Sequence, residues 1–255
     1  LGDLVLAFSL LLGSFIGLMF HLIVSIHYKL IKFGPLVINQ NIKSMLSQYP
    51  PKVTSGLLTG INPFVDQFFA AQLVVGSITA INYGTKIPAF VVGILMLAIG
   101  NVLLPHFAKQ INIDLEKAFK QLFKTLKIVF FSSSFVVLLM FLFSKEITEL
   151  LFERNEFTSQ DTSIVAVLQK IALVYVPFFL CTLVCVNFLT AINKNKFMAW
   201  VSFWNLILNL IMNIILVKKY GVYGLLISTT IVYIISSFIY VGFSIREHQL
   251  RFKSQ

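Results

Sequence analysis

The side chain best suited to chemistry in this sequence is Asp66, a carboxylate that interrupts a largely apolar stretch. Pro63 precedes it by about one helical turn, and Asn62 and Gln67 place further polar groups beside it. A proline inside a helix frees a backbone carbonyl, and an ionised side chain in hydrocarbon costs roughly 2.5–3.5 kcal/mol. Two interpretations stay open: Asp66 coordinates a cation or takes up a proton, or it is a structural carboxyl that is neutral or paired.

Asparagines recur at a spacing of four in a later apolar segment, at Asn205, Asn209 and Asn213. This spacing places them on one face of a helix, where a polar seam can also serve hydrogen bonds between helices. Thr229 lies in the next apolar segment. We predict a cation-coupling site for Na⁺ or a proton, with Na⁺ held at Asp66, from four residues that supply oxygen atoms: Asp66, Asn209, Asn213 and Thr229.

Two lysines also lie inside apolar segments. Lys86 precedes Pro88 by two residues, and Lys170 lies about three turns into a later segment. We predict that both bind the headgroup or pyrophosphate of an anionic substrate. The alternatives are that Lys86 extends to the membrane interface, and that Lys170 lines the cavity of Asp66 or pairs with that carboxylate.

The sequence contains no motif typical of a soluble enzyme. It has no P-loop, no HExxH, no G-x-S-x-G and no dinucleotide fingerprint. Its four histidines are scattered, and Cys181 and Cys185 lie four apart on one helical face without further metal ligands nearby. We therefore expect no enzyme activity, no cofactor and no metal other than Na⁺, and we interpret the cysteines as packing residues.

Composition indicates that lipid is part of the solvent of this chain. Of its 255 residues, 58% are hydrophobic and only 12% are charged. A soluble domain of this size carries about a quarter charged residues. The net charge of +10 comes from cations that cluster between apolar runs. This pattern favours contact with anionic membrane lipids and excludes nucleic acid as the expected partner.

Seven segments are long and apolar enough to be predicted as membrane spans. Backbone groups in hydrocarbon must be hydrogen-bonded within the segment, so the prediction is helices and an all-α membrane protein. The predicted spans are residues 4–27, 53–74, 77–104, 118–143, 162–190, 197–217 and 222–245.

The loops alternate in charge, and most of the 20 lysines and arginines fall on one side of the predicted bundle. The positive-inside rule assigns that side to the cytoplasm, together with the C-terminus, and the N-terminus to the outside. Lys218 and Lys219 are exceptions to this rule.

Two amphipathic segments and one helix cap are predicted near the membrane surfaces. Residues 38–49 are expected to form a helix lying on the membrane, and residues 114–127 carry lysines on one helical face opposite leucines and phenylalanines. Residues 158–161, with the sequence Thr-Ser-Gln-Asp, resemble a capping box for the helix that follows.

Three stretches resemble the MurJ/MviN lipid II flippases, within the multidrug/oligosaccharidyl-lipid/polysaccharide exporter superfamily. Residues 65–70, 76–80 and 93–105 look like the family's seventh and eighth helices, and residues 150–162 resemble the outer loop before its tenth. Residues 205–213 and 221–225 look like its eleventh and twelfth helices.

The resemblance implies a domain organisation. Residues 1–33 would be a transmembrane helix matching the end of the N-terminal lobe, and residues 34–52 a cytoplasmic amphipathic linker. Residues 53–246 would form a six-helix C-terminal lobe, and residues 247–255 a cytoplasmic tail. A two-lobed cavity needs more chain than this, so a missing N-terminal lobe or a second chain is an expected partner.

The resemblance also implies a function in the bacterial inner membrane. The expected substrate is lipid II or a related polyprenyl-pyrophosphate-linked glycan, flipped by alternating access for peptidoglycan or cell-envelope glycan synthesis. Lys86 stands where the family has an arginine, Thr85 where it usually has an aspartate, and residues 193–196 lack the expected Asp and Thr-Pro. The alternatives are a cation-coupled small-molecule antiporter of the multidrug type and an inactive half-transporter fragment.

Overall fold

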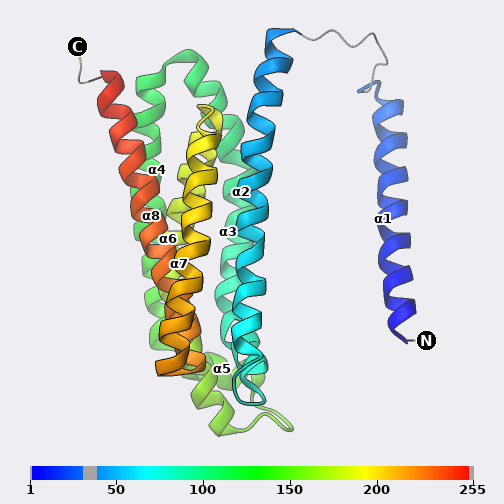
Figure 1. Ribbon diagram of the computed structural model, residues 1–255, viewed down its shortest axis with the longest axis vertical. Helices are drawn as coiled ribbons and strands as arrows, with labels where there is room; N and C mark the ends of the chain where they lie inside the picture. The colour runs from blue at the N-terminus through cyan, green and yellow to red at the C-terminus, as the bar shows by residue number, and fades with distance from the viewer. Residues whose placement is uncertain (1, 31–38, 253–255) are drawn as a thin grey trace. The chain divides into compact units, whose positions relative to one another are not determined.

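The computed structural model describes residues 2–30 and 39–252, and the described residues form helices joined by short turns, without a β-strand. The predicted all-α class is therefore confirmed. Figure 1 shows the helices in chain order: α1 (Gly2–His27), α2 (Gln40–Ala70), α3 (Ser77–Ile113), α4 (Leu115–Leu142), α5 (Ser144–Phe152), α6 (Ser159–Ala191), α7 (Asn195–Tyr220) and α8 (Val222–Phe252).

Six of the helices in the described ranges are long and apolar enough to cross a membrane: α1, α3, α4, α6, α7 and α8. The sequence predicted about seven spans, and α2 is the helix that does not qualify. Its length is sufficient, but polar side chains such as Lys52, Asn62 and Asp66 lower its hydropathy. The number of spans supported by length and composition is therefore six.

The start of α2 differs from the prediction. A separate surface helix over residues 38–49 was expected, followed by a span from residue 53. Instead α2 runs without a break from Gln40 through Pro50 and Pro51 to Ala70. Two adjacent prolines remove backbone donors without ending this helix, and Asn39 begins it by accepting the backbone N–H of Ile42 at 3.0 Å. Residue 38 lies outside the described residues.

The chain divides into two compact units, residues 1–44 and 45–255. The first unit contains α1, whose apolar side chains are largely exposed. Exposed apolar surface of this extent suits a helix that faces lipid or a partner. The second unit contains all of the predicted site residues.

Helix α6 is the centre of the second unit, where it packs against α3, α4, α5 and α8. The largest core cluster lies at the ends of α3 and α4 near the α6–α7 turn. There the Phe188 ring contacts Phe107 and Phe119 edge to face, with ring centroids 5.3 Å and 4.8 Å apart. Cys181 and Cys185 are buried in the same cluster as free thiols, in agreement with their predicted packing role.

Short connections fix how neighbouring helices meet. A single residue, Gly221, joins α7 to α8 with a φ of 57°, a left-handed conformation that glycine adopts at little cost. Such a tight joint folds α8 back along α7. The site residues of the two helices, Asn209 and Asn213 on α7 and Thr229 on α8, are thereby brought to the same depth.

Two helix starts carry side-chain caps, and one of the two was predicted. The predicted capping box is confirmed: Asp161 accepts the Thr158 backbone N–H at 2.9 Å, and Thr158 Oγ1 accepts the Asp161 backbone N–H at 3.4 Å. Asp114 separates α3 from α4 and accepts the Lys117 backbone N–H at 3.0 Å. This hydrogen bond lowers the pKa of the Asp114 carboxyl. The predicted amphipathic segment 114–127 is the first part of α4.

Candidate cation site

Asp66 lies where α2 meets α7 and α8, two consecutive helices that are far from it in sequence. Its Oδ1 accepts hydrogen bonds from Asn213 Nδ2 at 2.9 Å and from Asn209 Nδ2 at 3.3 Å. Its Oδ2 accepts one from Thr229 Oγ1 at 3.0 Å. The structure therefore brings together all four residues that the sequence singled out, with α2, α7 and α8 each contributing at least one.

The two asparagines form a rigid wall for this carboxylate. Asn209 and Asn213 are one turn apart on α7, and Asn213 Nδ2 also donates to Asn209 Oδ1 at 3.2 Å. Both are buried, at 2% and 0% exposed. Ser228, beside Thr229, donates to the Asn209 backbone carbonyl at 3.5 Å and joins α8 to the same wall.

One buried oxygen at the site accepts no hydrogen bond from the described residues. Asn213 Oδ1 is buried and makes no hydrogen bond within the described part of the chain. A buried polar atom without a partner loses the free energy of its hydration, so such atoms usually mark a bound water or ion. This oxygen belongs to the side chain that already holds Asp66.

Asp66 is nearer to a helix end than the sequence suggested. The predicted span placed it midway, whereas α2 ends at Ala70, about one turn after Asp66. The difference arises because α2 begins earlier and ends earlier than the apolar run. Asp66 consequently lies close to the α2–α3 turn rather than at the middle of its helix.

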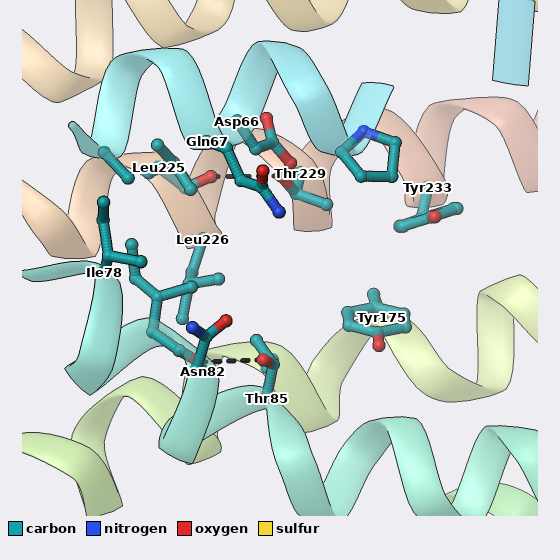
Figure 2. A pocket seen from close by; sticks show the side chains of 14 residues that line it. Asp66, Gln67, Ile78, Asn82, Thr85, Tyr175, Leu225, Leu226, Thr229 and Tyr233 are labelled. Atoms are coloured by element: carbon teal, nitrogen blue, oxygen red, sulfur yellow. Dashed lines mark hydrogen bonds between the residues drawn. The ribbon is translucent and has the colours of Figure 1, made fainter. Parts of the chain in front are cut away.

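Two cavities border the carboxylate. The smaller, of about 210 Å³, is lined by residues of α2, α3, α6 and α8. Figure 2 shows Asp66 and Thr229 on one wall, with Tyr175 and Thr85 across from them. Tyr233 lies beside Tyr175, and their rings stack with centroids 5.0 Å apart. The larger cavity, of about 510 Å³, extends from Asp66 toward Lys52.

This arrangement suits a cation of low charge. One carboxylate supplies a single negative charge, and amide and hydroxyl oxygens supply neutral ligands of the kind that bind Na⁺ in transporters. Within the described ranges, no group of three or more His, Cys, Asp or Glu residues is placed to hold a metal ion. A proton on Asp66 is the other chemistry that the geometry permits.

The two predicted substrate lysines lie away from this site. Lys86 is exposed on α3, with its Nζ 5.6 Å from the centre of the Tyr83 ring. The Nζ of Lys170 lies 5.5 Å from the centre of the Phe141 ring, on α4. Neither lysine lines a cavity that Asp66 borders. The alternative in which Lys170 lines the Asp66 cavity is therefore wrong.

Sequence reasoning missed the hydroxyl groups along the larger cavity. Ser55, Thr59, Ser202 and Ser236 all line it, yet none is ionisable and none stood out from composition. A usable signal was present on α2, where polar residues recur every three or four positions. Asn205, which the sequence did single out, donates to Ser236 Oγ at 2.9 Å rather than to Asp66.

Comparisons with known proteins point to one family. The family model described as "Lipid II flippase MurJ" matches residues 1–255. The "Probable lipid II flippase MurJ" of Helicobacter pylori (strain ATCC 700392 / 26695) is 27% identical over 206 residues, covering 78% of this chain and 44% of that protein. The protein of the same name from Bdellovibrio bacteriovorus is 24% identical over 197 residues, covering 76% of this chain and 37% of its own. The chain thus spans less than half the length of these relatives.

Solved structures share the fold. "Lipid II flippase MurJ, inward closed conformation" aligns with a TM-score of 0.67 and 24% identity, covering 88% of this chain and 47% of that one. A transporter of the MOP superfamily from Pyrococcus furiosus aligns with the same TM-score at 14% identity, covering 78% of this chain and 44% of its own. At these identities the likeness concerns the fold alone.

Proposed function

This chain belongs to the lipid II flippase MurJ family, a family of membrane transporters rather than enzymes, and from that premise we propose that it forms one lobe of a cation-coupled flippase. The substrate would be lipid II or a related polyprenyl-pyrophosphate-linked glycan, moved across the bacterial inner membrane. The observation that carries the proposal is the Asp66 cluster, because it joins three helices through one carboxylate inside the lobe.

In this proposal Na⁺ binds between Asp66 and the oxygens of Asn209, Asn213 and Thr229. The orphaned Oδ1 of Asn213 supports this role, since rotation of the amide by half a turn would present an oxygen to the ion. The ion would neutralise the carboxylate and link α2 to α7 and α8. Coupling requires that one conformation of the transporter binds the ion more tightly than the other.

The substrate would meet the lobe at basic side chains. We assign the pyrophosphate or headgroup to Lys86, which is exposed on α3, and retain Lys170 as a second candidate. A lysine offers phosphate a point charge rather than the two-pronged contact of arginine. Membrane lipids and the other lobe, supplied by a further segment or a second chain, would be the remaining partners.

The lobe would be embedded with its basic loops in the cytoplasm. We assign residues 53–246 to the six-helix C-terminal lobe, with α2 as one of its six spans and the polar face of α2 turned into the lobe. That arrangement would remove Lys52 and Asp66 from lipid contact. It would also explain why α2 is less hydrophobic than the helices that qualify as membrane spans. The segments 1–33, 34–52 and 247–255 would be the preceding span, the linker and the tail.

Binding of the lipid substrate tests the proposal. The protein would be purified from bacterial membranes, and native mass spectrometry would measure bound polyprenyl-pyrophosphate glycans in the wild type, Lys86→Ala and Lys145→Ala. Lys145 is an exposed lysine on α5 and serves as the matched control. We expect occupancy to fall in Lys86→Ala alone. Equal occupancy in all three proteins would contradict the role of Lys86, and absence of the lipid from all three would contradict the proposed substrate.

A further inference from the structure

Helix α2 carries a seam of polar residues along one side. They recur every three or four positions, the spacing that keeps side chains on one helical face. In order from the start of the helix toward its end, the seam consists of Gln48, Lys52, Ser55, Thr59, Asn62 and Asp66. A continuous polar face on a helix inside a membrane protein must lie against polar partners or water.

Partners for this seam come from α6 and α7. Near the start of the seam, Lys52 Nζ donates to Thr190 Oγ1 at 3.1 Å. One turn further on, the hydroxyls of Ser55 and Ser202 lie 2.9 Å apart, and Thr59 Oγ1 is 3.4 Å from the same Ser202 oxygen. These hydrogen bonds between side chains hold α2 to the bundle at intervals, and space remains between them.

That space is the larger cavity, of about 510 Å³. Lys52 lines one end and Asp66 the other, and hydroxyl or amide groups line much of the wall between them. A single water needs roughly 10–15 Å³ of such volume and a few polar partners, so this cavity has room for several waters beside its polar groups. Asn62 Oδ1 is buried at the cavity without a partner in the described residues, which is a further place for water to bind.

The smaller cavity meets Asp66 from the other side. It contains Ala70 and Ile78, which flank the α2–α3 turn at the opposite end of α2 from Lys52. Asp66 and Thr229 belong to the walls of both cavities. The carboxylate therefore lies where two separate spaces approach each other from opposite ends of the helix.

We propose that the larger cavity is a water-filled route through which a monovalent cation travels between Asp66 and the Lys52 end of the lobe. The route lies inside the lobe, between α2 and α7, and rests on the cation role of Asp66 given above. Along it, the hydroxyls of Ser55 and Thr59 both approach that of Ser202. Lys52 acts as a barrier at the mouth, because its positive charge repels an arriving cation.

Thiol labelling tests the route directly. In a parent with Cys181→Ala and Cys185→Ala, single cysteines would be placed at Ser202 and Ser236, which line the cavity and are only 5% and 2% exposed. Matched controls on the same helices are Phe203→Cys and Phe238→Cys, at 44% and 67% exposed but apolar and outward-facing. The probe would be a small cationic methanethiosulfonate that does not cross membranes. Lys196→Cys, an exposed position at the start of α7, would report which face of the vesicle the probe reaches.

The cavity cysteines are expected to label faster than the control cysteines, although the cavity positions are the less exposed of the two. Methanethiosulfonates react with the thiolate, which forms only where water is present, so cavity cysteines should react at least about tenfold faster than the controls. Labelling should occur only from the face on which Lys196→Cys reacts. Adding Lys52→Gln should accelerate labelling at Ser202→Cys, because the repulsive charge at the mouth is removed. Equal rates in cavity and control positions, or labelling from the other face only, would overturn the route.

A second measurement separates this route from the cation site itself. Labelling of Ser202→Cys would be repeated with Asp66→Asn, which removes the carboxylate and leaves the cavity lining intact. The route predicts that Na⁺ slows labelling while Asp66 is present, and that in Asp66→Asn labelling persists but is no longer slowed by Na⁺. Na⁺ binding without labelling of the cavity cysteine would refute the route alone. Labelling of the cavity cysteine without any effect of Na⁺ would refute the cation role of Asp66, and with it the identity of the travelling ion.

Discussion

At the scale of single residues, the proposed cation site depends on one carboxylate, Asp66, whose two oxygens accept hydrogen bonds from Asn209, Asn213 and Thr229. Asp66 could be predicted as a site residue because a carboxylate is costly in an apolar segment. Asn209 and Asn213 could be predicted because a spacing of four places them on one face of a helix. No feature of the sequence fixes which face of α7 meets α2. That choice depends on packing, and only the structure shows Asn213 Nδ2 2.9 Å from the carboxylate.

Two adjacent threonines on α8 are expected to have different roles, one in ion binding and the other in helix packing. Thr229 donates to Asp66 at 3.0 Å, whereas Thr230 donates to the Ile171 backbone carbonyl at 3.2 Å. Thr→Val removes one hydroxyl at either position, at a cost of about 1 kcal/mol. We expect both variants to lower the Tm, but only Thr229→Val to weaken Na⁺ binding in a titration followed by thermal shift. An equal loss of Na⁺ affinity in both variants would contradict this assignment.

At the scale of helices, most elements were predictable because long apolar runs specify their own secondary structure. The exception is α2, whose polar seam lowered its hydropathy and whose first part was predicted to be a separate surface helix ending at residue 49. Contacts between helices were harder to predict from the sequence than the helices themselves. Gly84, for example, sits where α3 touches α6, and a Cβ built there would lie 2.7 Å from Leu168 Cβ.

A pair of glycines on α3 tests the close approach of α3 and α6. We expect Gly84→Ala to destabilise the protein by about 1–3 kcal/mol, because the added methyl group must force the helices apart. Gly93→Ala is the control, since a Cβ at that position meets nothing within 4 Å. There the alanine should be neutral or stabilise the helix by up to about 1 kcal/mol. Thermal unfolding in detergent measures both, and a Tm for Gly84→Ala at or above that of Gly93→Ala would show that the contact is absent.

A buried ion pair fixes the α6–α7 turn to α8. Lys194 Nζ contacts Glu247 Oε1 at 2.7 Å, and Arg251 contacts Oε2 at 3.4 Å, with Glu247 only 9% exposed. Glu247→Gln should lower the free energy of unfolding by about 1.5–3 kcal/mol, as expected for a charged hydrogen bond lost from a buried position. Glu116→Gln, which affects the exposed pair with Lys120, should destabilise the protein much less, because water screens that pair. Denaturation of both variants would reveal any reversal of this order.

At the scale of the whole molecule, the distribution of charged residues predicts the orientation in the membrane, and the matching family model shows the family. The basic loops predict orientation because lysine and arginine are retained on the cytoplasmic side. Residues 1–44 form a unit of their own, and the chain spans less than half the length of its curated relatives. Sequence pattern alone predicted both the all-α class and the family, since each depends on composition and local motifs rather than on packing.

Reporter fusions test the predicted orientation. A fluorescent protein fused after Gln255 should fold and emit, and alkaline phosphatase fused there should be inactive, because the basic tail is expected in the cytoplasm. Fusions placed after Tyr220, between α7 and α8, should give the opposite pair of results. Phosphatase activity at the C-terminal fusion would reverse the orientation, and with it the assignment of the Lys52 end to the cytoplasm.

The central claim is that Asp66 holds a cation, and Na⁺-dependent thermal stability tests it most directly. The Tm of the wild type would be compared with that of Asp66→Asn across a range of NaCl at constant ionic strength. Asp114→Asn provides the control, because that carboxylate caps α4 and pairs with Lys117, and it lines neither cavity at Asp66. An ion present at a hundredfold excess over its Kd stabilises the folded state by about 2.7 kcal/mol, so the wild type and Asp114→Asn should show a rising Tm. The account predicts no Na⁺-dependent rise in Asp66→Asn. The same rise in all three proteins, or none in the wild type, would contradict it.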